Sequence, residues 1–103
     1  MSDSIVGETR DGTFRITTTG RLVFSLNARF RNVARDALAS PATTIEVDLA
    51  SVNYVDSAAL GMLLWLRDAA TQAGKNVVLS GVHGVTKTVF EVAHFEKLFK
   101  INP

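Results

Sequence analysis

The segment from residue 43 to residue 82 constrains the fold most, because a helix pattern in it separates two strand patterns. Residues 43–49, TTIEVDL, alternate polar and apolar side chains, as a strand with one buried face does. Residues 57–73 have helical periodicity, and Gly74 stands where a helix commonly ends in left-handed backbone. Residues 76–82, NVVLSGV, are typical of a buried strand. This order predicts two parallel strands joined by a crossover helix.

The N-terminal third adds a hairpin and a helix. Residues 4–20 predict two short antiparallel strands around Asp11-Gly12, a dipeptide that suits a tight turn. Residues 25–39 predict a helix with Ser25 as its N-cap and Ser40-Pro41 as its stop. The apolar stripe of this helix consists of Leu26, Phe30, Val33 and Ala37.

The C-terminal part predicts a third helix and a short strand. Residues 85–95 carry Val85, Val89 and Val92 at helical spacing, and residues 98–101, LFKI, suit a last short strand. The whole pattern predicts an α/β fold with a single mixed, mostly parallel sheet, an N-terminal antiparallel hairpin and three to four helices. No repeat or linker interrupts it, so we expect one domain over residues 1–103.

Composition narrows the classes of function. A formal net charge of +1 gives no basic field that would attract nucleic acid or an anionic membrane. The chain has no cysteine, and its two histidines lack metal-ligand spacing, so we expect no metal site and no cofactor. No apolar run is long enough to span a membrane, and no secretion signal is present, so we expect a cytoplasmic protein.

Ser57 lies at the junction between the strand and the helix, and two interpretations of it remain open. As an N-cap, its oxygen would accept one of the unpartnered N–H groups of the first turn, with Asp56 favoured by the helix dipole. As a phosphoacceptor, it would carry an anion where the helix start already favours negative charge. The two roles are compatible.

Residues 48–61, DLASVNYVDSAALG, resemble the central motif of STAS domains, the family of anti-sigma factor antagonists. In that motif an apolar strand of the type DLS.V leads into DSSGLG and a helix. The matching positions are Asp48, Leu49, Ala50, Val52, Asp56, Ser57, Leu60 and Gly61. Residues 20–38 are similar to the family's first helix and its lead-in, so the resemblance extends from about residue 13 to the end. The chain departs from it at Val23, where an aspartate is usual, and at Ala58 and Ala59.

The resemblance implies a regulator that is not an enzyme. An unphosphorylated antagonist of this family binds an ATP-dependent serine kinase that is also the anti-sigma factor, phosphorylation of the motif serine breaks the complex, and a serine phosphatase restores it. Carried over, Ser57 is the phosphorylation site. The expected partner-binding residues are Asp56, Ser57, Ala58, Gly61 and Trp65.

Trp65 enters this set because of its place on the helix. If Ala59, Leu63, Leu66 and Ala70 face the sheet, Trp65 points away from it and would serve as an interface anchor. The alternative is that the third helix or the C-terminal tail covers it. Three arginines of the first helix are expected to form a solvated face: Arg29, Arg31 and Arg35.

Two other functions compete with this one. Ser57 and His83 both follow predicted strands, which faintly resembles a hydrolase, but Val55 and Ala59 stand where the nucleophile motif G-x-S-x-G needs glycine. The second is a STAS-like subunit that scaffolds a transporter or lipid-trafficking complex without phosphorylation.

Overall fold

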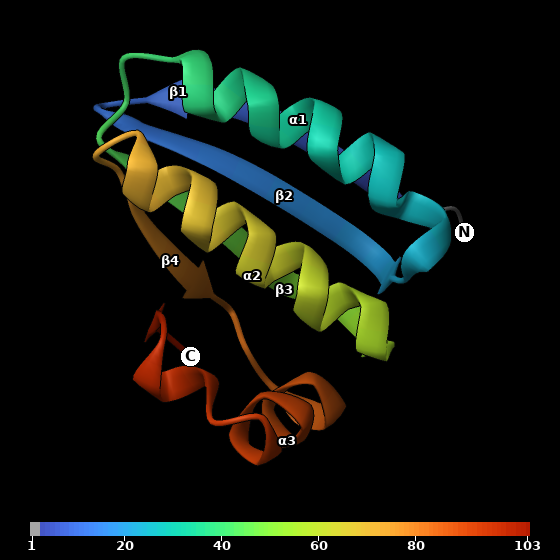
Figure 1. Cartoon of the computed structure of the whole chain (residues 1–103). Helices are drawn as coiled ribbons and strands as arrows, with labels where there is room; N and C mark the ends of the chain where they lie inside the picture. The colour runs from blue at the N-terminus through green and yellow to red at the C-terminus, as the bar shows by residue number, and fades with distance from the viewer. Residues whose placement is uncertain (1–2) are drawn as a thin grey trace.

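A five-stranded sheet organises the molecule, and the computed structural model describes residues 3–103. Its strands lie in the order in which they occur along the chain (Figure 1). β1 is antiparallel to β2, and every other neighbouring pair is parallel. The predicted mixed, mostly parallel sheet with an N-terminal hairpin is therefore confirmed. The strands are β1 (Ser4–Arg10), β2 (Thr13–Leu22), β3 (Thr44–Val55), β4 (Asn76–Ser80) and β5 (Lys100–Ile101).

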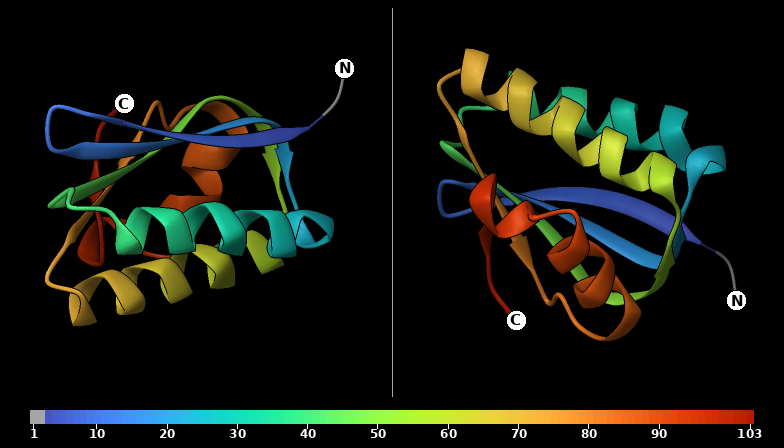
Figure 2. Two further views of the ribbon diagram at one scale, coloured as in Figure 1. Left: turned by 90° about the horizontal axis from the view of Figure 1, so that it is seen from above. Right: turned by 60° about the horizontal axis from the view of Figure 1, so that its bottom comes forward.

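Three helices and two short 3₁₀ turns complete the fold. α1 and α2 lie side by side over one face of the sheet (Figures 1 and 2). α3 follows β4 in the chain and packs mainly against β3. None of the helices within residues 3–103 is long and apolar enough to span a membrane. The bounds are η1 (Phe24–Leu26), α1 (Asn27–Ala39), α2 (Ser57–Gln72), α3 (Gly84–Val92) and η2 (Phe95–Lys97).

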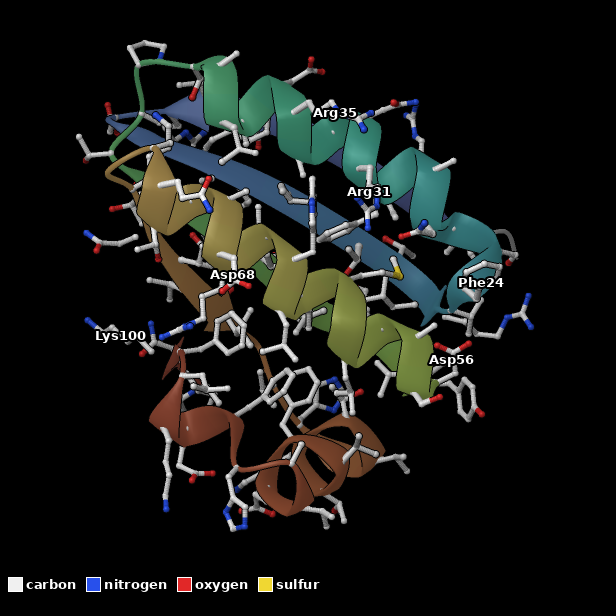
Figure 3. All side chains as sticks on the ribbon, in the orientation of Figure 1. Phe24, Arg31, Arg35, Asp56, Asp68 and Lys100 are labelled. Atoms are coloured by element: carbon white, nitrogen blue, oxygen red, sulfur yellow. The ribbon has the colours of Figure 1, made fainter. Side chains whose placement is uncertain are left out.

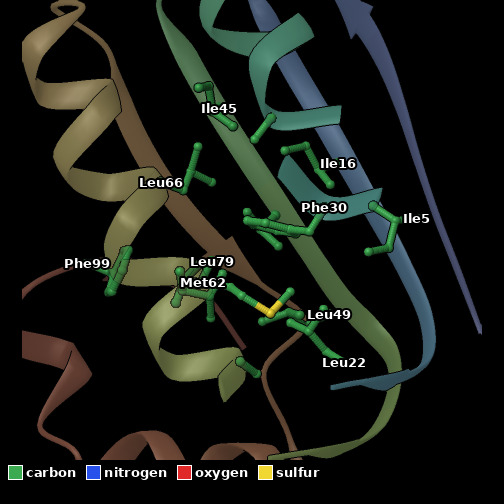
Figure 4. Close-up of a cluster of buried hydrophobic side chains, with 14 of the residues drawn as sticks. Ile5, Ile16, Leu22, Phe30, Ile45, Leu49, Met62, Leu66, Leu79 and Phe99 are labelled. Atoms are coloured by element: carbon green, nitrogen blue, oxygen red, sulfur yellow. The ribbon is translucent and has the colours of Figure 1, made fainter. Parts of the chain in front are cut away.

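The core lies between the sheet and the helices that cover it, and it includes buried residues of α3 (Figure 4). The alternate β3 residues Ile45, Val47 and Leu49 are fully buried, as the alternation predicts. α2 buries the predicted face, to which Met62 also belongs. The largest fully buried side chains are Phe30, Phe90, Ile5, Ile16, Leu22, Ile45, Leu49, Leu63, Leu66 and Leu79.

Positive backbone φ angles explain two predicted chain reversals. Asp11 and Gly12 have φ angles of 51° and 80°, which the tight turn between β1 and β2 requires. Gly74 has a φ angle of 73° just after α2, a conformation that disfavours a residue with a side chain. Both turns are confirmed.

β3 is longer than its sequence pattern predicts. The alternation ends at Leu49, yet β3 continues to Val55 because it pairs with β2 over most of its length. Arg21 lies opposite Tyr54, and Leu22 lies opposite Val55. The extension carries the end of the strand directly to the junction at Ser57.

The predicted start of the first helix is wrong. Ser25 lies inside the turn η1, α1 begins at Asn27, and no side chain caps its N-terminus. The turn provides a hydrogen-bond partner for a backbone N–H group before the helix, since the Leu26 N–H donates to the Val23 carbonyl at 2.9 Å. The predicted end is confirmed, because α1 stops at Ala39.

Two of the three valines at helical spacing in the third helix lie on its exposed side. Val85 and Val92 are 59% and 76% exposed, whereas Thr86 and Phe90 are buried. Phe90 stacks on Phe95, with ring centroids 4.9 Å apart, so aromatic packing decides the orientation of α3. The helix ends earlier than predicted, and the last short strand forms as β5.

Candidate functional site

The N-cap of α2 is Asp56 and not Ser57. Asp56 has extended backbone angles, φ −100° and ψ 178°, and its Oδ1 accepts a hydrogen bond from the Ala59 N–H at 3.0 Å. Ser57 is the first residue of α2 and is exposed. The N-cap interpretation of Ser57 is therefore wrong, because the neighbouring carboxylate is an equally good cap and already occupies that position.

The second carboxylate oxygen of Asp56 reaches a different part of the chain. Oδ2 accepts from the Phe24 N–H at 3.0 Å, and the Asp56 N–H lies 3.4 Å from the Leu22 carbonyl (Figure 3). One side chain therefore connects the start of α2 to the turn between β2 and α1. Phosphorylation at Ser57 would take place beside this connection.

Replacing Ser57 by alanine should change the free energy of unfolding by less than about 0.5 kcal/mol, because its hydroxyl does not cap the helix. Replacing Asp56 by alanine should cost about 0.5–2 kcal/mol from the lost cap alone. Urea unfolding of the two variants checks both values. An equal loss in both would show that Ser57 has a structural role.

Two exposed aromatic side chains lie next to this junction, and the sequence analysis missed both. The side chain of Phe24 is 70% exposed, and its backbone N–H donates a hydrogen bond to Asp56. Tyr54 is 49% exposed and stands two residues before Asp56 on β3. Exposed aromatic side chains are typical of interface anchors. A sequence signal exists for Phe24, which directly precedes the predicted helix and lies outside its apolar stripe.

The outer side of α2 continues the same surface. Ala58 is half-buried and Gly61 is exposed. A Cβ atom on Gly61 would meet no atom within 4 Å, so a partner can approach the helix backbone closely here.

Trp65 is half-buried, and neither predicted environment describes it. The guanidinium of Arg31 on α1 lies over the indole, 4.4 Å from the ring centroid. Part of its cover therefore comes from α1, and the indole also packs against the core. Arg29 donates a hydrogen bond to the Ile5 carbonyl on β1, and Arg35 donates one to Asn32 on its own helix.

Asp3 and Arg21 form an ion pair near the turn η1. The Arg21 N–H and guanidinium donate to the Asp3 carboxylate at 3.0 and 2.9 Å, and these bonds lower the pKa of Asp3. A lowered pKa means that the pair stabilises the fold above the ordinary pKa of aspartate and loses this effect as the pH falls. The pair is exposed to solvent, so its contribution is small.

The hydrolase interpretation gains no geometric support. His83 is exposed, and its Nε2 lies 2.9 Å from the Ala50 carbonyl, a structural hydrogen bond. Within residues 3–103 no group of three His, Asp or Glu side chains is placed to hold a metal ion.

Two comparisons of the sequence with known proteins find the same kind of domain. The family model described as "Mlab, STAS domain" matches residues 7–100. A STAS-domain containing protein of Pseudomonas aeruginosa is 34% identical over 87 residues, which cover 84% of this chain and 85% of that protein.

Solved structures with a similar fold come from several functional settings. A protein of Thermotoga maritima, provisionally assigned as an anti-sigma factor antagonist, has a TM-score of 0.83 at 17% identity and covers 96% of this chain and 86% of its own. The anti-sigma factor antagonist SpoIIAA, in its unphosphorylated form, has a TM-score of 0.75 at 18% identity, with coverages of 95% and 86%. A sulfate transporter family protein of Wolinella succinogenes has a TM-score of 0.77 at 16% identity, with coverages of 92% and 80%. At these identities the likeness concerns the fold.

Proposed function

The chain belongs to the STAS domain family, and on that premise we propose that it is an anti-sigma factor antagonist that works by partner switching. In its unphosphorylated form it binds an ATP-dependent serine kinase that is also an anti-sigma factor. Phosphorylation of Ser57 releases it, and a serine phosphatase restores binding. The observation that carries the proposal is that Ser57 is exposed at the start of α2 while Asp56 supplies the cap.

The physics of the helix start supports this role for Ser57. A phosphate adds about two negative charges and three acceptor oxygens. The first turn of a helix presents N–H groups and the positive end of the helix dipole, which favour an anion. Because Asp56 keeps the cap, a phosphate on Ser57 would change the surface without unfolding α2.

We propose that the kinase docks on the surface around this serine. The predicted contacts are Asp56, Ser57, Ala58, Gly61 and Trp65, to which the exposed side chains of Phe24 and Tyr54 are added. Phe24 and Tyr54 replace Trp65 as the principal anchors, since they are more exposed and Arg31 partly covers the indole. Gly61 lets the partner approach the backbone of α2.

The first experiment incubates the purified protein with ATP and a candidate serine kinase encoded beside it. Intact-mass and peptide mass spectrometry should find one added phosphate, on Ser57. Ser57→Ala should abolish it and retain binding of the kinase. Ser25→Ala, which removes another exposed serine, serves as the matched control and should be phosphorylated normally. A single phosphosite at any other residue would contradict the proposal.

A second candidate function is supported by two comparisons. The family model carries the description "Mlab", and one similar structure is a sulfate transporter family protein. In this alternative the chain is a STAS-like scaffold subunit of a transporter or lipid-trafficking complex, and Ser57 is not phosphorylated. Stable copurification with a transporter ATPase, with no phosphate gained from ATP and the kinase, would favour it.

A further inference from the structure

A cavity of about 460 Å³ opens at the end of α2 that is remote from Ser57. It lies between the second half of α2, the first residues of β3 and β4, and β5. Its lining includes three cationic side chains, Arg67, Lys75 and Lys100, and no carboxylate. Arg67 stands ten positions after Ser57, which is about 15 Å along a helix axis. The cavity is therefore separate from the proposed docking surface.

Backbone carbonyls hold two of these cations in place. The Nε of Arg67 donates to the Leu98 carbonyl at 2.7 Å. The Nζ of Lys75 donates to the Ser40 carbonyl at 2.7 Å and to the carbonyl of Ala42. A carbonyl orients a cation but does not neutralise it, and a guanidinium with one donor used has four left. Both charges are thus fixed in position and still available to an anion.

The ion pairs among residues 3–103 leave the cavity with an excess of positive charge. Neither Lys75 nor Lys100 takes part in one. Arg67 Nη1 lies 3.7 Å from the carboxylate of Asp68, which is largely exposed, and surface pairs of this kind are weak and easily exchanged. Figure 3 shows Lys100 and Asp68 on the same side of the molecule.

The C-terminal end of α2 does not oppose an anion here as strongly as a bare helix end would. The Lys75 N–H donates to the Ala70 carbonyl at 2.8 Å, and the Gly74 N–H donates to the Thr71 carbonyl at 3.1 Å. Because these carbonyls are bonded within their own turn, the side-chain cations dominate the electrostatic potential of the cavity.

The rest of the lining defines the size and character of a ligand. Thr44 and Asn76 add neutral polar groups, and Val77, Val78 and Leu98 add apolar surface. The volume lies in the range of roughly 300–1,000 Å³ that is usual for small-molecule sites. We propose that this cavity binds a phosphate monoester of a small organic molecule: Arg67 and Lys100 hold the phosphate and the apolar residues contact its organic part. The proposal does not depend on the function of Ser57.

The test is a titration of the whole chain, followed by the backbone amide signals in NMR. The probes are adenosine monophosphate, inorganic phosphate, and phosphatidylcholine vesicles that contain phosphatidic acid. We expect saturable shifts at Thr44, Asn76 and Lys100 with adenosine monophosphate, and affinity about tenfold lower for inorganic phosphate, which lacks the apolar contacts. Binding to the vesicles with the same residues involved, and not to adenosine monophosphate, would assign the monoester to a lipid headgroup.

Variants separate a site from general charge attraction. Lys100→Gln and Arg67→Gln should each weaken binding about tenfold or more, because each removes a charge-assisted contact. Lys87→Gln, an exposed lysine on α3, removes the same charge elsewhere and should bind normally. Lys100 is exposed, so its variant should fold even if Arg67→Gln does not. Absence of saturable shifts with every probe, or equal weakening by Lys87→Gln, would overturn the proposal.

Discussion

Replacing Phe24 by alanine should weaken the complex with the serine kinase by at least about 2 kcal/mol, or about 30-fold in dissociation constant. The side chain is 70% exposed in the free chain, and its backbone is held by Asp56. Because the backbone of Phe24 is already fixed in the free chain, binding pays little conformational entropy to order it. Most of the free energy gained by burying the ring therefore contributes to affinity. Its removal opens no cavity in the core, so the free energy of unfolding should change by less than about 0.5 kcal/mol.

Val92→Ala provides the matched control for Phe24→Ala. Val92 is also apolar and is exposed to a similar extent, but it lies on α3 at the end of that helix. Isothermal titration calorimetry with the unphosphorylated protein should find its affinity unchanged. Equal affinity losses in the two variants, or none in either, would place the kinase on another surface.

The order of elements could be predicted because local patterns determine it. The alternation of β3, the positive φ angle at Gly74 and the Asp11-Gly12 turn each depend on a few neighbouring residues. The mixed sheet then follows from the connections that parallel strands require. These parts of the fold are encoded locally, and the structure confirms them.

The features that local patterns do not predict depend on contacts with distant parts of the chain. Two adjacent residues, Asp56 and Ser57, could both cap α2, and the contact with Phe24 on another segment belongs to the aspartate. α3 turns Phe90 inward because Phe95, which lies beyond the helix, stacks on it. The periodicity of one segment cannot predict either contact, because each joins two segments.

The environment of Trp65 depends on the neighbouring helix in the same way. Its position on α2 predicts that it points away from the sheet, but the indole is half-buried, packs against the core and lies under the guanidinium of Arg31 on α1. Likewise, the cavity near Lys100 combines side chains from α2 and three strands, which no single stretch of sequence brings together. The phosphoacceptor role of Ser57 remains a prediction.

Ser57→Asp is expected to reduce affinity for the kinase by about 2–5 kcal/mol while the chain stays folded. The folded state tolerates the new carboxylate because it lies in the first turn of α2, where the helix dipole favours negative charge. The complex does not tolerate it, since the charge would lose water against a surface that already contains the carboxylate of Asp56 and the rings of Phe24 and Tyr54.

Ser57→Asn separates the effect of charge on affinity from the effect of side-chain size, because asparagine matches aspartate in size and carries no charge. It should keep most of the affinity of the unphosphorylated protein, whereas Ser57→Asp and the enzymatically phosphorylated protein should both lose it. Surface plasmon resonance on the three forms, with circular dichroism to verify folding, measures this directly. If Ser57→Asn fell as far as Ser57→Asp, release would depend on bulk at the start of α2. If all three forms bound as tightly as the unmodified chain, phosphorylation of Ser57 would not control the complex, and the partner-switching proposal would fail.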